Sequence, residues 1–352
     1  MAIVPWYNFS WQYRVKITSD NTKVSSANDN LYVDLSDLPS SFFSNVRSDG
    51  GDIRVTKSDG VTEVAREVVT IDTGGSTGEL HFDSTGLSTS SDTEWYIYYG
   101  NASATDYAPS DTYGAENVWN SNFLLVYHMQ QDPSGTAPQM IDSTSNGNDG
   151  TTSGTMTSGD LVTSKIEKGI DFDGTDDSID TGAALFSTSN NAAPYTISCW
   201  VNTTATNDGG IVTQYSDSAP VDRFGFRLNS GKIAWWKGGT FLASSTTSVN
   251  TGANVFVAGT KSSGQTVQMY VNGAANGSSG TDSDDFDTAN VAIANFDPGV
   301  AQYDGIIDEI RISDVQRSAN WLLTEYNNQN SPSTFWTIGS QEDVFIPQII
   351  IS

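Results

Sequence analysis

The stretch YTISCWV, residues 195–201, is central to the fold because polar and apolar side chains alternate along most of its length. A period of two places successive side chains on opposite faces of a β-strand, and aromatic and β-branched residues favour strands. Similar runs occur at residues 13–17, 31–35, 53–55, 95–99, 123–128, 169–172, 223–228, 232–236, 255–260, 267–271 and 306–312. Turn-forming residues separate them, so the sequence predicts an all-β protein.

The composition supports a polar, globular chain and argues against two classes of partner. The chain has 352 residues, of which 16% are charged, and 42 acidic residues against 16 Lys and Arg give a net charge of −26. Such a charge repels phosphate backbones and anionic lipid headgroups. We therefore expect neither nucleic acid nor a membrane surface as a partner.

The length and the spacing of the runs predict two domains. We expect a β-sandwich over residues 1–105, a second over residues 119–340, and an apolar tail over residues 341–352. Residues 106–118 lack periodicity and are interpreted as a linker or a wrapping segment. A helix is expected over residues 319–326, capped by Ser318, and the pair Asn272-Gly273 is typical of a hairpin tip.

Part of the first half resembles a known family. The stretches WQYRVKI (11–17), GDIRVTKSDG (51–60) and IYYGN (97–101) are similar to the domain-of-unknown-function family 2341 of bacteria and viruses. The resemblance covers about residues 6–105.

The second half resembles laminin-G-like, concanavalin A-type jelly rolls. The stretches that carry the resemblance are VYHM (126–129), DSTSNGNDG (142–150), FDGTDDSI (172–179), TISCWV (196–201) and GIIDEIRI (305–312). Together they cover about residues 119–340. The resemblance implies a jelly-roll fold and either a glycan-binding module or, less often, a glycoside hydrolase or lyase.

Catalytic residues are hard to find in this sequence. A retaining glycosidase needs two carboxylates about 5–5.5 Å apart in one cleft. Asp308 and Glu309 are adjacent, so regular alternation would point them to opposite faces of a strand. Asp171 and Asp173 can share a face, but Gly174 follows at once and suggests a turn. We therefore expect a protein that is not an enzyme.

The other reactive side chains fit structural roles better than catalytic ones. Cys199, the only cysteine, lies within a strand-like run and is expected to be buried. His128 also falls in an apolar run, whereas His81 belongs to the other half of the chain. We interpret both histidines as packed side chains with polar partners.

A calcium site is the most credible cofactor site in the sequence, because oxygen-rich loops suit a hard cation. In the resembled fold such an ion commonly joins an N-terminal loop to the last strand, which implies the ligands Asp142, Asn146, Asn148 and Asp308. The alternative is that these side chains only hydrogen-bond the local backbone. A second acidic group is interpreted as a solvated turn and comprises Asp173, Asp176, Asp177 and Asp180.

Two consecutive tryptophans are the candidate sugar-binding residues. Sugars stack their C–H surfaces on aromatic rings and direct their hydroxyls to a few polar groups. Trp235 and Trp236 must face opposite sides of a strand, so one of them is expected on the surface unless loops or the first domain cover it. The expected polar companions are Tyr215, Asp217 and Arg223.

The end of the chain is strongly apolar and would be prone to β-aggregation if exposed. It can add a strand to its own domain or to a neighbouring subunit, and we favour the neighbour. The side chains expected to mediate this assembly are Phe345, Ile346, Ile349, Ile350 and Ile351.

These features favour a non-enzymatic protein of a virion surface, namely a decoration, spike or fibre protein whose lectin-like domain attaches to host glycans. The composition is typical of extracellular proteins, so we expect an extracellular location. The start of the chain shows no signal segment, which favours an unusual route such as release by lysis, as for a virus particle, or a processed precursor. The alternatives are a glycan-binding adhesin of a bacterial or archaeal cell surface, a purely structural capsid decoration protein and, last, a polysaccharide-degrading enzyme.

Overall fold

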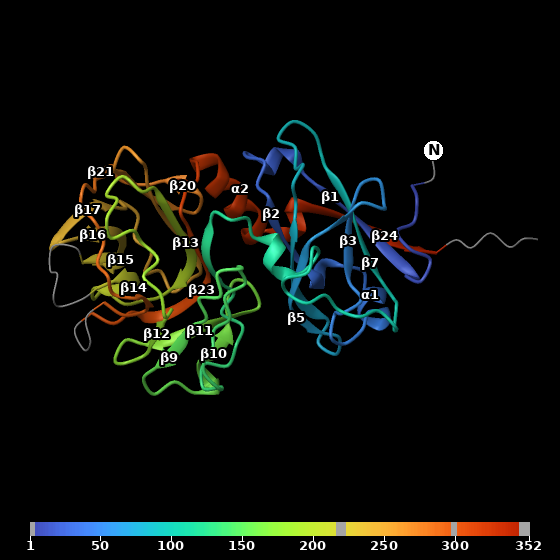
Figure 1. The fold of residues 1–352 in the computed structure, drawn as a ribbon, viewed down its shortest axis with the longest axis horizontal. Coiled ribbons are helices and arrows are strands. Elements are labelled where there is room, and N and C mark those ends of the chain that lie inside the picture. Colours follow the sequence, from blue (N-terminus) through green and yellow to red (C-terminus); the bar gives the residue numbers. More distant parts are fainter. Residues whose placement is uncertain (1–3, 216–222, 297–300, 345–352) are drawn as a thin grey trace, which may run out of the picture. The chain divides into compact units, whose positions relative to one another are not determined.

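The computed structural model describes residues 4–215, 223–296 and 301–344, and strands dominate it (Figure 1). The chain divides into two compact units. Unit 1 comprises Met1–Trp119 and Asn327–Ser352, and unit 2 comprises Asn120–Tyr326. The all-β prediction is confirmed. No helix among the described residues has both the length and the apolar character needed to cross a membrane.

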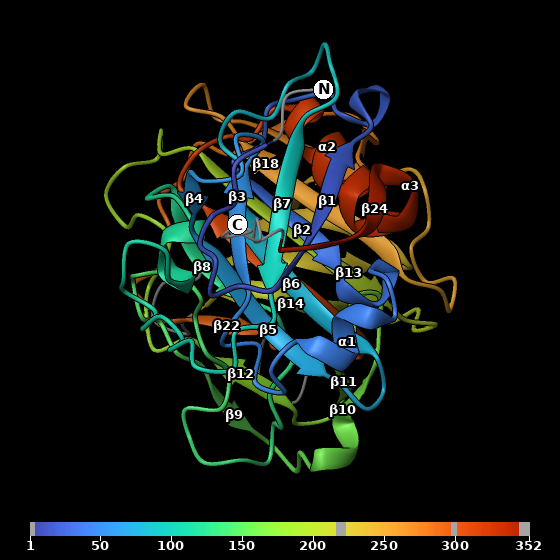
Figure 2. The same cartoon turned by 90° about the vertical axis from the view of Figure 1, so that its right-hand side faces the viewer.

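Unit 1 contains two antiparallel sheets, which Figure 2 shows from a second direction. The first has the order β24 (Trp336–Asp343), β1 (Tyr13–Ser19), β7 (Glu94–Tyr99), β3 (Arg54–Lys57) and β4 (Glu63–Val64). The second has the order β2 (Asn30–Asp34), β6 (Thr77–Asp83) and β5 (Arg66–Asp72). Unit 1 also contains the short helices η1 (Asn21–Lys23), η2 (Leu35–Asp37), α1 (Ser41–Asn45), η3 (Ala115–Val118) and α3 (Pro332–Phe335).

The core of unit 1 forms where the inward faces of its two sheets meet. Val15 and Ile17 of β1 belong to the same buried cluster as Leu80 and Phe82 of β6, and all four are fully buried. Each pair is separated by one residue, as the alternation of a half-buried strand requires. The predicted sandwich in the first half of the chain therefore has its physical basis in this apolar cluster.

One boundary of the predicted domains is wrong. We expected the second domain to run to residue 340, but β24 pairs with β1 in unit 1, where Ser19 lies opposite Trp336. Phe335 and Trp336 also join the unit 1 core. The reason is that β1 is left with an open edge that a segment remote in sequence can complete.

Residues 106–118, left open as a linker or a wrapping segment, pack on unit 1. The Arg66 backbone N–H donates to the Tyr113 carbonyl, the Arg66 guanidinium pairs with Asp106, and Tyr107 Oη donates to Glu63. These contacts identify the stretch as a wrapping segment rather than a free linker.

Unit 2 contains two larger antiparallel sheets. The first, sheet A, has the order β10 (Leu161–Thr163), β11 (Lys168–Asp173), β23 (Asp304–Ser313), β13 (Tyr195–Asn202), β18 (Val255–Lys261), β19 (Thr266–Val271) and β20 (Ala274–Ala275), with β8 (Phe123–Tyr127) beside β23 and β21 (Gly280–Thr281) beside β19. The second, sheet B, has the order β17 (Thr240–Ser244), β16 (Lys232–Lys237), β15 (Phe224–Asn229), β14 (Gly209–Gln214), β22 (Val291–Ile293), β12 (Ser178–Asp180) and β9 (Thr151–Ser153). A short helix, η4 (Ser158–Asp160), precedes β10.

The two sheets of unit 2 share one apolar core. Ile197 and Cys199 of sheet A lie in the same buried cluster as Phe224 and Trp235 of sheet B. This is the sandwich expected for the second half of the chain. Cys199 is fully buried, as predicted.

The predicted helix is present and longer than expected. It is α2 (Ala319–Asn330), and the Trp321 backbone N–H donates to the Ser318 hydroxyl at 3.1 Å, so Ser318 caps it as predicted. Leu322 packs with Trp200 and Phe256 in a separate apolar cluster that includes residues from β13 and β18.

The predicted hairpin tip is also present. Asn272 and Gly273 join β19 to β20, and both have positive φ, at 50° and 75°. A two-residue turn with positive φ at both positions matches the twist of the flanking strands.

A bulge in β23 overturns the expected alternation of Asp308 and Glu309. Ser198 of β13 lies opposite Arg311, but Trp200 lies opposite Asp308, so β23 carries one extra residue opposite Cys199. Glu309 has a φ of +52°, and its carboxylate pairs with Arg311. The two acidic residues therefore do not diverge as they would in a regular strand.

Candidate functional site

The consecutive tryptophans of β16 occupy different environments. Trp235 is fully buried in the core, and its Nε1 donates to Asp282 Oδ2 at 2.9 Å. Trp236 is half-buried on the outer face of sheet B, where its ring meets the Phe296 ring edge to face at 4.8 Å. Of the two predicted sugar-binding tryptophans, only Trp236 is placed to contact a ligand.

Aromatic and basic side chains gather around Trp236. Tyr215 packs on Phe296 with ring centroids 5.2 Å apart, and Phe241 is 39% exposed. The Arg227 guanidinium carbon lies 4.2 Å from the Phe296 ring centre, and that of Arg223 lies 4.2 Å from the Tyr215 ring centre. We name this group the outer-face cluster; its members are Tyr215, Arg223, Arg227, Trp236, Phe241 and Phe296.

Two glycines make room for Phe296 on the sheet. Gly225 lies opposite Trp236 in the β15–β16 pair, and a Cβ atom at this position would lie 3.1 Å from the Phe296 ring. A Cβ atom at Gly210 would lie 2.8 Å from Phe296 Cβ and 2.6 Å from the Asn295 carbonyl oxygen. The missing side chains allow the Phe296 ring to lie close to the strand backbone.

Arg227 links the cluster electrostatically to its surroundings. It is 5% exposed, and its guanidinium pairs with Asp208 at 3.3 Å. Burial lowers the pKa of Arg227 below its ordinary value, and Asp208 partly offsets this effect. Arg227 is therefore buried and stabilises the position of Phe296 by a cation–π contact.

The structure brings together three of the five predicted sugar-binding residues. Tyr215, Arg223 and Trp236 join the cluster, Trp235 does not, and Asp217 lies outside the described residues. Arg227, Phe241 and Phe296 also belong to the cluster and were not predicted from the sequence. Pairing the strands across the Ser230-Gly231 turn places Arg227 opposite Ala234, on the same face of the sheet as Trp236. No local sequence pattern predicts the position of Phe296.

The predicted calcium loop is stabilised by its own hydrogen bonds. Asp142 Oδ1 accepts from the backbone N–H groups of Val126 and Thr144, and Oδ2 accepts from the Thr144 hydroxyl and the Asn148 N–H. The Asn146 and Asn148 amides donate to the Leu124 carbonyl. These contacts correspond to the alternative of local backbone hydrogen bonding.

The fourth expected calcium ligand, Asp308, hydrogen-bonds a different segment. It is fully buried, and its Oδ2 accepts from the Ile166 backbone N–H at 2.9 Å. Burial raises the pKa of Asp308 well above its usual range, and Glu309 raises it further. The calcium-binding role of Asp142, Asn146, Asn148 and Asp308 stays a prediction.

The bulge in β23 is part of a buried ionic network within unit 2. Glu309 pairs with His128 and with Arg311, and Arg311 also pairs with Glu325 of α2 at 3.2 Å. Burial raises the pKa of Glu325, whereas Arg311 and the Ser198 hydroxyl lower it. His128 is thus a packed histidine with a polar partner, as expected.

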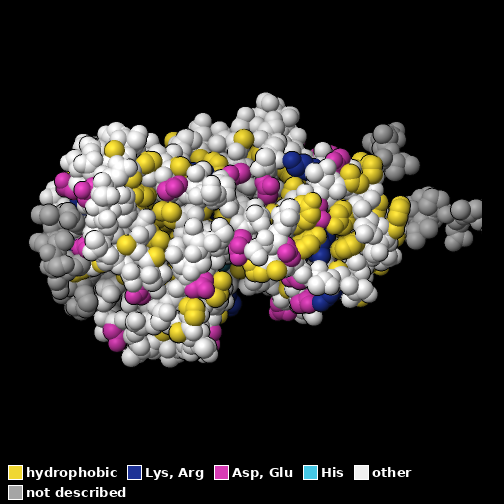
Figure 3. All heavy atoms as spheres, viewed as in Figure 1, with side chains coloured by type: hydrophobic (Ala, Val, Ile, Leu, Met, Phe, Trp, Pro, Cys, Tyr) yellow, Lys and Arg dark blue, Asp and Glu magenta, His cyan; other side chains and the backbone are white. Residues whose placement is uncertain are grey.

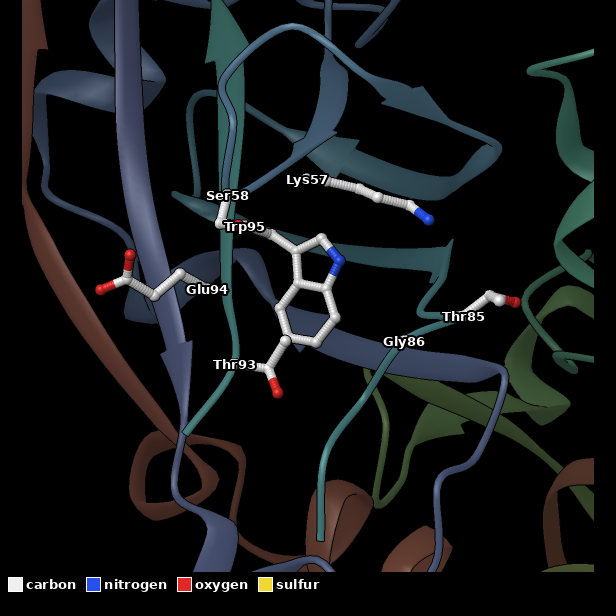
Figure 4. A pocket seen from close by; sticks show the side chains of 7 residues that line it. All are labelled: Lys57, Ser58, Thr85, Gly86, Thr93, Glu94 and Trp95. Carbon is white, nitrogen blue, oxygen red and sulfur yellow. The ribbon is translucent and has the colours of Figure 1, made fainter. Parts of the chain in front are cut away.

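A small cavity of about 150 Å³ lies in unit 1 beside Trp95 (Figure 4). Lys57 and Glu94 extend to opposite sides of the Trp95 ring, and Glu94 pairs with Lys16. Trp95 itself is 1% exposed and belongs to the core of unit 1. Ligand pockets are usually about 300–1,000 Å³, so this cavity is too small to define a site.

Acidic side chains are spread widely over the face drawn in Figure 3, whereas Lys and Arg side chains are sparse there. This matches the net charge of −26. The residues predicted to mediate assembly, Phe345, Ile346, Ile349, Ile350 and Ile351, lie outside the described residues.

The comparison with protein families supports the fold of unit 2. Residues 173–322 match the model of the concanavalin A-like lectin/glucanases superfamily. This confirms the predicted jelly roll, whereas the resemblance of residues 6–105 to family 2341 gains no support. No curated protein sequence matches the chain.

Three solved structures show a distant similarity to this chain. Domain 4 of AbnA, a GH43 extracellular arabinanase from Geobacillus stearothermophilus in complex with arabinotriose, is 20% identical with a TM-score of 0.43, over 58% of this chain and 98% of that one. The binding domain of Paraclostridial Mosquitocidal Protein 1 is 10% identical with a TM-score of 0.44, over 58% of this chain and 52% of that one. The receptor binding domain of botulinum neurotoxin D is 14% identical with a TM-score of 0.43, over 59% of this chain and 53% of that one. The matched part of this chain spans about half the length of the two toxin domains.

Proposed function

We propose that the protein is a non-enzymatic, lectin-like module that binds glycans on the outer face of sheet B in unit 2. The observation that carries the proposal is the outer-face cluster, in which Trp236 and the exposed Phe241 present aromatic surface on a concanavalin A-like jelly roll.

The chemistry of the outer-face cluster suits a sugar. Aromatic rings stack on the C–H faces of a pyranose or furanose, and guanidinium and phenol groups donate directed hydrogen bonds to hydroxyls. Tyr215 and Arg223 are half-buried and supply such polar groups beside the rings. A shallow site of this kind binds weakly, so strong attachment requires several copies acting together.

Binding rather than hydrolysis is proposed because the adjacent acids of β23 are inaccessible. Asp308 and Glu309 are 0% and 1% exposed, and the Glu309 carboxylate pairs with His128 and Arg311. A glycosidase needs both carboxylates in an open cleft with the scissile bond between them.

For the biological setting we propose a virion surface, where the module attaches a particle to host glycans. The polar composition supports an extracellular location, and the virion is the extracellular setting that we propose. A cell-surface adhesin, a structural decoration protein and a polysaccharide-degrading enzyme are the alternatives. Mass spectrometry distinguishes the virion surface from the cell surface, because the protein is expected in purified particles in the first case and in cell-surface fractions in the second.

The test is a glycan array probed with the full chain in multimerised form, in calcium and in EDTA. Trp236→Ala and Phe241→Ala are expected to weaken binding to any retained glycan about 3- to 10-fold, the range of an aromatic contact. Phe9→Ala is the matched control, because Phe9 is an exposed aromatic residue (62%) of unit 1. The EDTA arm tests the calcium role predicted for the loop around Asp142.

The outcomes separate the alternatives. Binding that is weakened about 3- to 10-fold in both cluster variants and unchanged in Phe9→Ala supports the proposal, provided that circular dichroism shows folded proteins. No binding at any valency contradicts it and favours a structural decoration protein. Release of shortened products from a bound polysaccharide contradicts the non-enzymatic reading.

A further inference from the structure

The turn between β11 and β12 gathers three carboxylates. Asp173 ends β11, and Asp176 and Asp177 precede β12. One carboxylate oxygen from each lies within 4.8 Å of the other two. In the described part of the chain, none of the three forms an ion pair with Lys, Arg or His. We name this group the turn cluster.

More acidic residues surround the turn cluster. Asp173 lies opposite Asp304 in the β11–β23 pair, and a Cβ atom at Gly174 would lie 2.7 Å from Asp304 Cβ. The Asp160 carboxylate acts electrostatically on Asp177. Negative charge therefore accumulates at this end of β11.

Asp177 provides an independent sign that the turn cluster is incomplete. It is 3% exposed, and its Oδ1 atom is buried without a hydrogen-bond partner, while Oδ2 accepts from the Asp173 backbone N–H at 3.3 Å. Burial raises the pKa of Asp177, and Asp173 and Asp160 raise it further, whereas the nearby N–H groups of Asp173 and Thr155 lower it. A buried carboxylate without full compensation is unfavourable, and a bound cation would offset this cost.

A second segment of the chain, around Gly154, lies close to Asp177 Oδ1. Gly154 follows β9 with a φ of +100°, and a Cβ atom there would lie 2.6 Å from Asp177 Oδ1 and 2.7 Å from the Asp176 carbonyl oxygen. The Thr155 hydroxyl faces Asp176 Oδ1 at 3.5 Å. Only glycine at position 154 allows the backbone to approach Asp177 this closely. This approach places the Thr155 hydroxyl beside the turn cluster.

We propose that Asp173, Asp176 and Asp177 bind a calcium ion. Ca²⁺ lies about 2.3–2.6 Å from each of six to eight oxygens, so two oxygens that share one ion are at most about 5 Å apart, as in the turn cluster. Mg²⁺ demands a nearly ideal octahedron, whereas Ca²⁺ accepts an irregular set completed by carbonyl oxygens and water. The site is distinct from the loop around Asp142 and does not depend on glycan binding.

The experiment compares thermal unfolding of the full chain in EDTA and in about 10 mM CaCl₂, together with calorimetric titration by CaCl₂. For a dissociation constant in the range of extracellular calcium modules, calcium is expected to raise the melting temperature by about 4–8 °C. Asp177→Asn and Asp176→Asn are each expected to remove most of this shift and the heat of binding. In EDTA, Asp177→Asn is expected to be at least as stable as the wild type, because it removes a buried charge.

Asp180→Asn is the matched control, because Asp180 is an exposed acidic residue three positions further along the chain and outside the turn cluster. It is expected to keep the full calcium shift. Asp176 is exposed, so its variant tests the site even if Asp177→Asn fails to fold. The proposal is overturned if the wild type shows no calcium response, or if Asp176→Asn keeps the response. A response that only Asp142→Asn removes also overturns it and assigns the ion to the other loop.

Discussion

Trp235 and Trp236 are consecutive in β16, yet Trp235 hydrogen-bonds Asp282 inside the core and Trp236 packs against Phe296 on the outer face of sheet B. The pleat of one strand thus separates a structural tryptophan from a candidate binding tryptophan.

This separation predicts opposite effects at the two positions. Trp235→Phe keeps an aromatic ring of smaller size and removes the N–H donor to Asp282, whose pKa is raised by burial. We expect it to lower the free energy of unfolding by about 1–3 kcal/mol, with glycan binding unchanged. Urea denaturation and the glycan array measure the two effects. A larger loss of glycan binding in Trp235→Phe than in Trp236→Ala would contradict the assignment.

Gly225 is expected to be a support of the outer-face cluster. Gly225→Val places a branched side chain where the Phe296 ring lies, so the ring must move and the contact with Trp236 is lost. We expect weaker glycan binding by about 3- to 10-fold. Gly264→Val is the control, because a Cβ atom there meets only Ser262 Oγ at 3.6 Å. Equal binding by both variants would show that Phe296 has no supporting role.

Arg311 is expected to be essential to the stability of unit 2. Arg311→Met leaves Glu309 and Glu325 buried without the guanidinium between them. We expect a loss of about 3–5 kcal/mol in the free energy of unfolding. Lys16→Met, which breaks the exposed pair with Glu94, is expected to change it by no more than about 1 kcal/mol. Chemical denaturation checks both values, and similar losses would refute the argument.

Cys199 is expected to be inert in the folded protein. It is fully buried, and burial together with Asp308 and Glu325 raises the pKa of its thiol, so the reactive thiolate is scarce. A thiol reagent such as Ellman's reagent should react in denaturant and not in native buffer. Rapid reaction under native conditions would contradict the buried position.

Because of Lys261, the free energy of unfolding is expected to increase as the pH rises through the alkaline range. It is fully buried, its ammonium donates to the Ala193 carbonyl, and burial lowers its pKa, while Asp282 and Asp285 raise it. A lowered folded-state pKa means that the contribution to stability is complete above the unfolded pKa of about 10.5 and is lost as the pH falls through the folded value.

The variant Lys261→Met isolates this effect. The free energy of unfolding of the wild type minus that of the variant is expected to increase as the pH rises from 7 to about 10. Urea denaturation at several pH values measures it. A difference that stays constant with pH would show that burial does not lower the pKa of Lys261.

The sequence by itself determined the features that depend on neighbouring residues. The alternation in 195–201 identified a strand, Ser318 marked the start of α2, and Asn272-Gly273 marked a hairpin. Alternation, capping and turn conformation are set within a few residues, so local chemistry suffices to predict them. The jelly-roll motifs extended this to the fold of unit 2.

Tertiary structure alone decided which remote segments meet. A strand-like run does not specify its partner, and β24 belongs to unit 1 because it pairs with β1, where Ser19 lies opposite Trp336. The same holds for Phe296 over Gly225 and for Gly154 over Asp177. These contacts join segments that are far apart in the chain, and they depend on how whole sheets pack and where a missing side chain leaves room. The glycan and calcium sites proposed for this protein both rest on contacts of that kind.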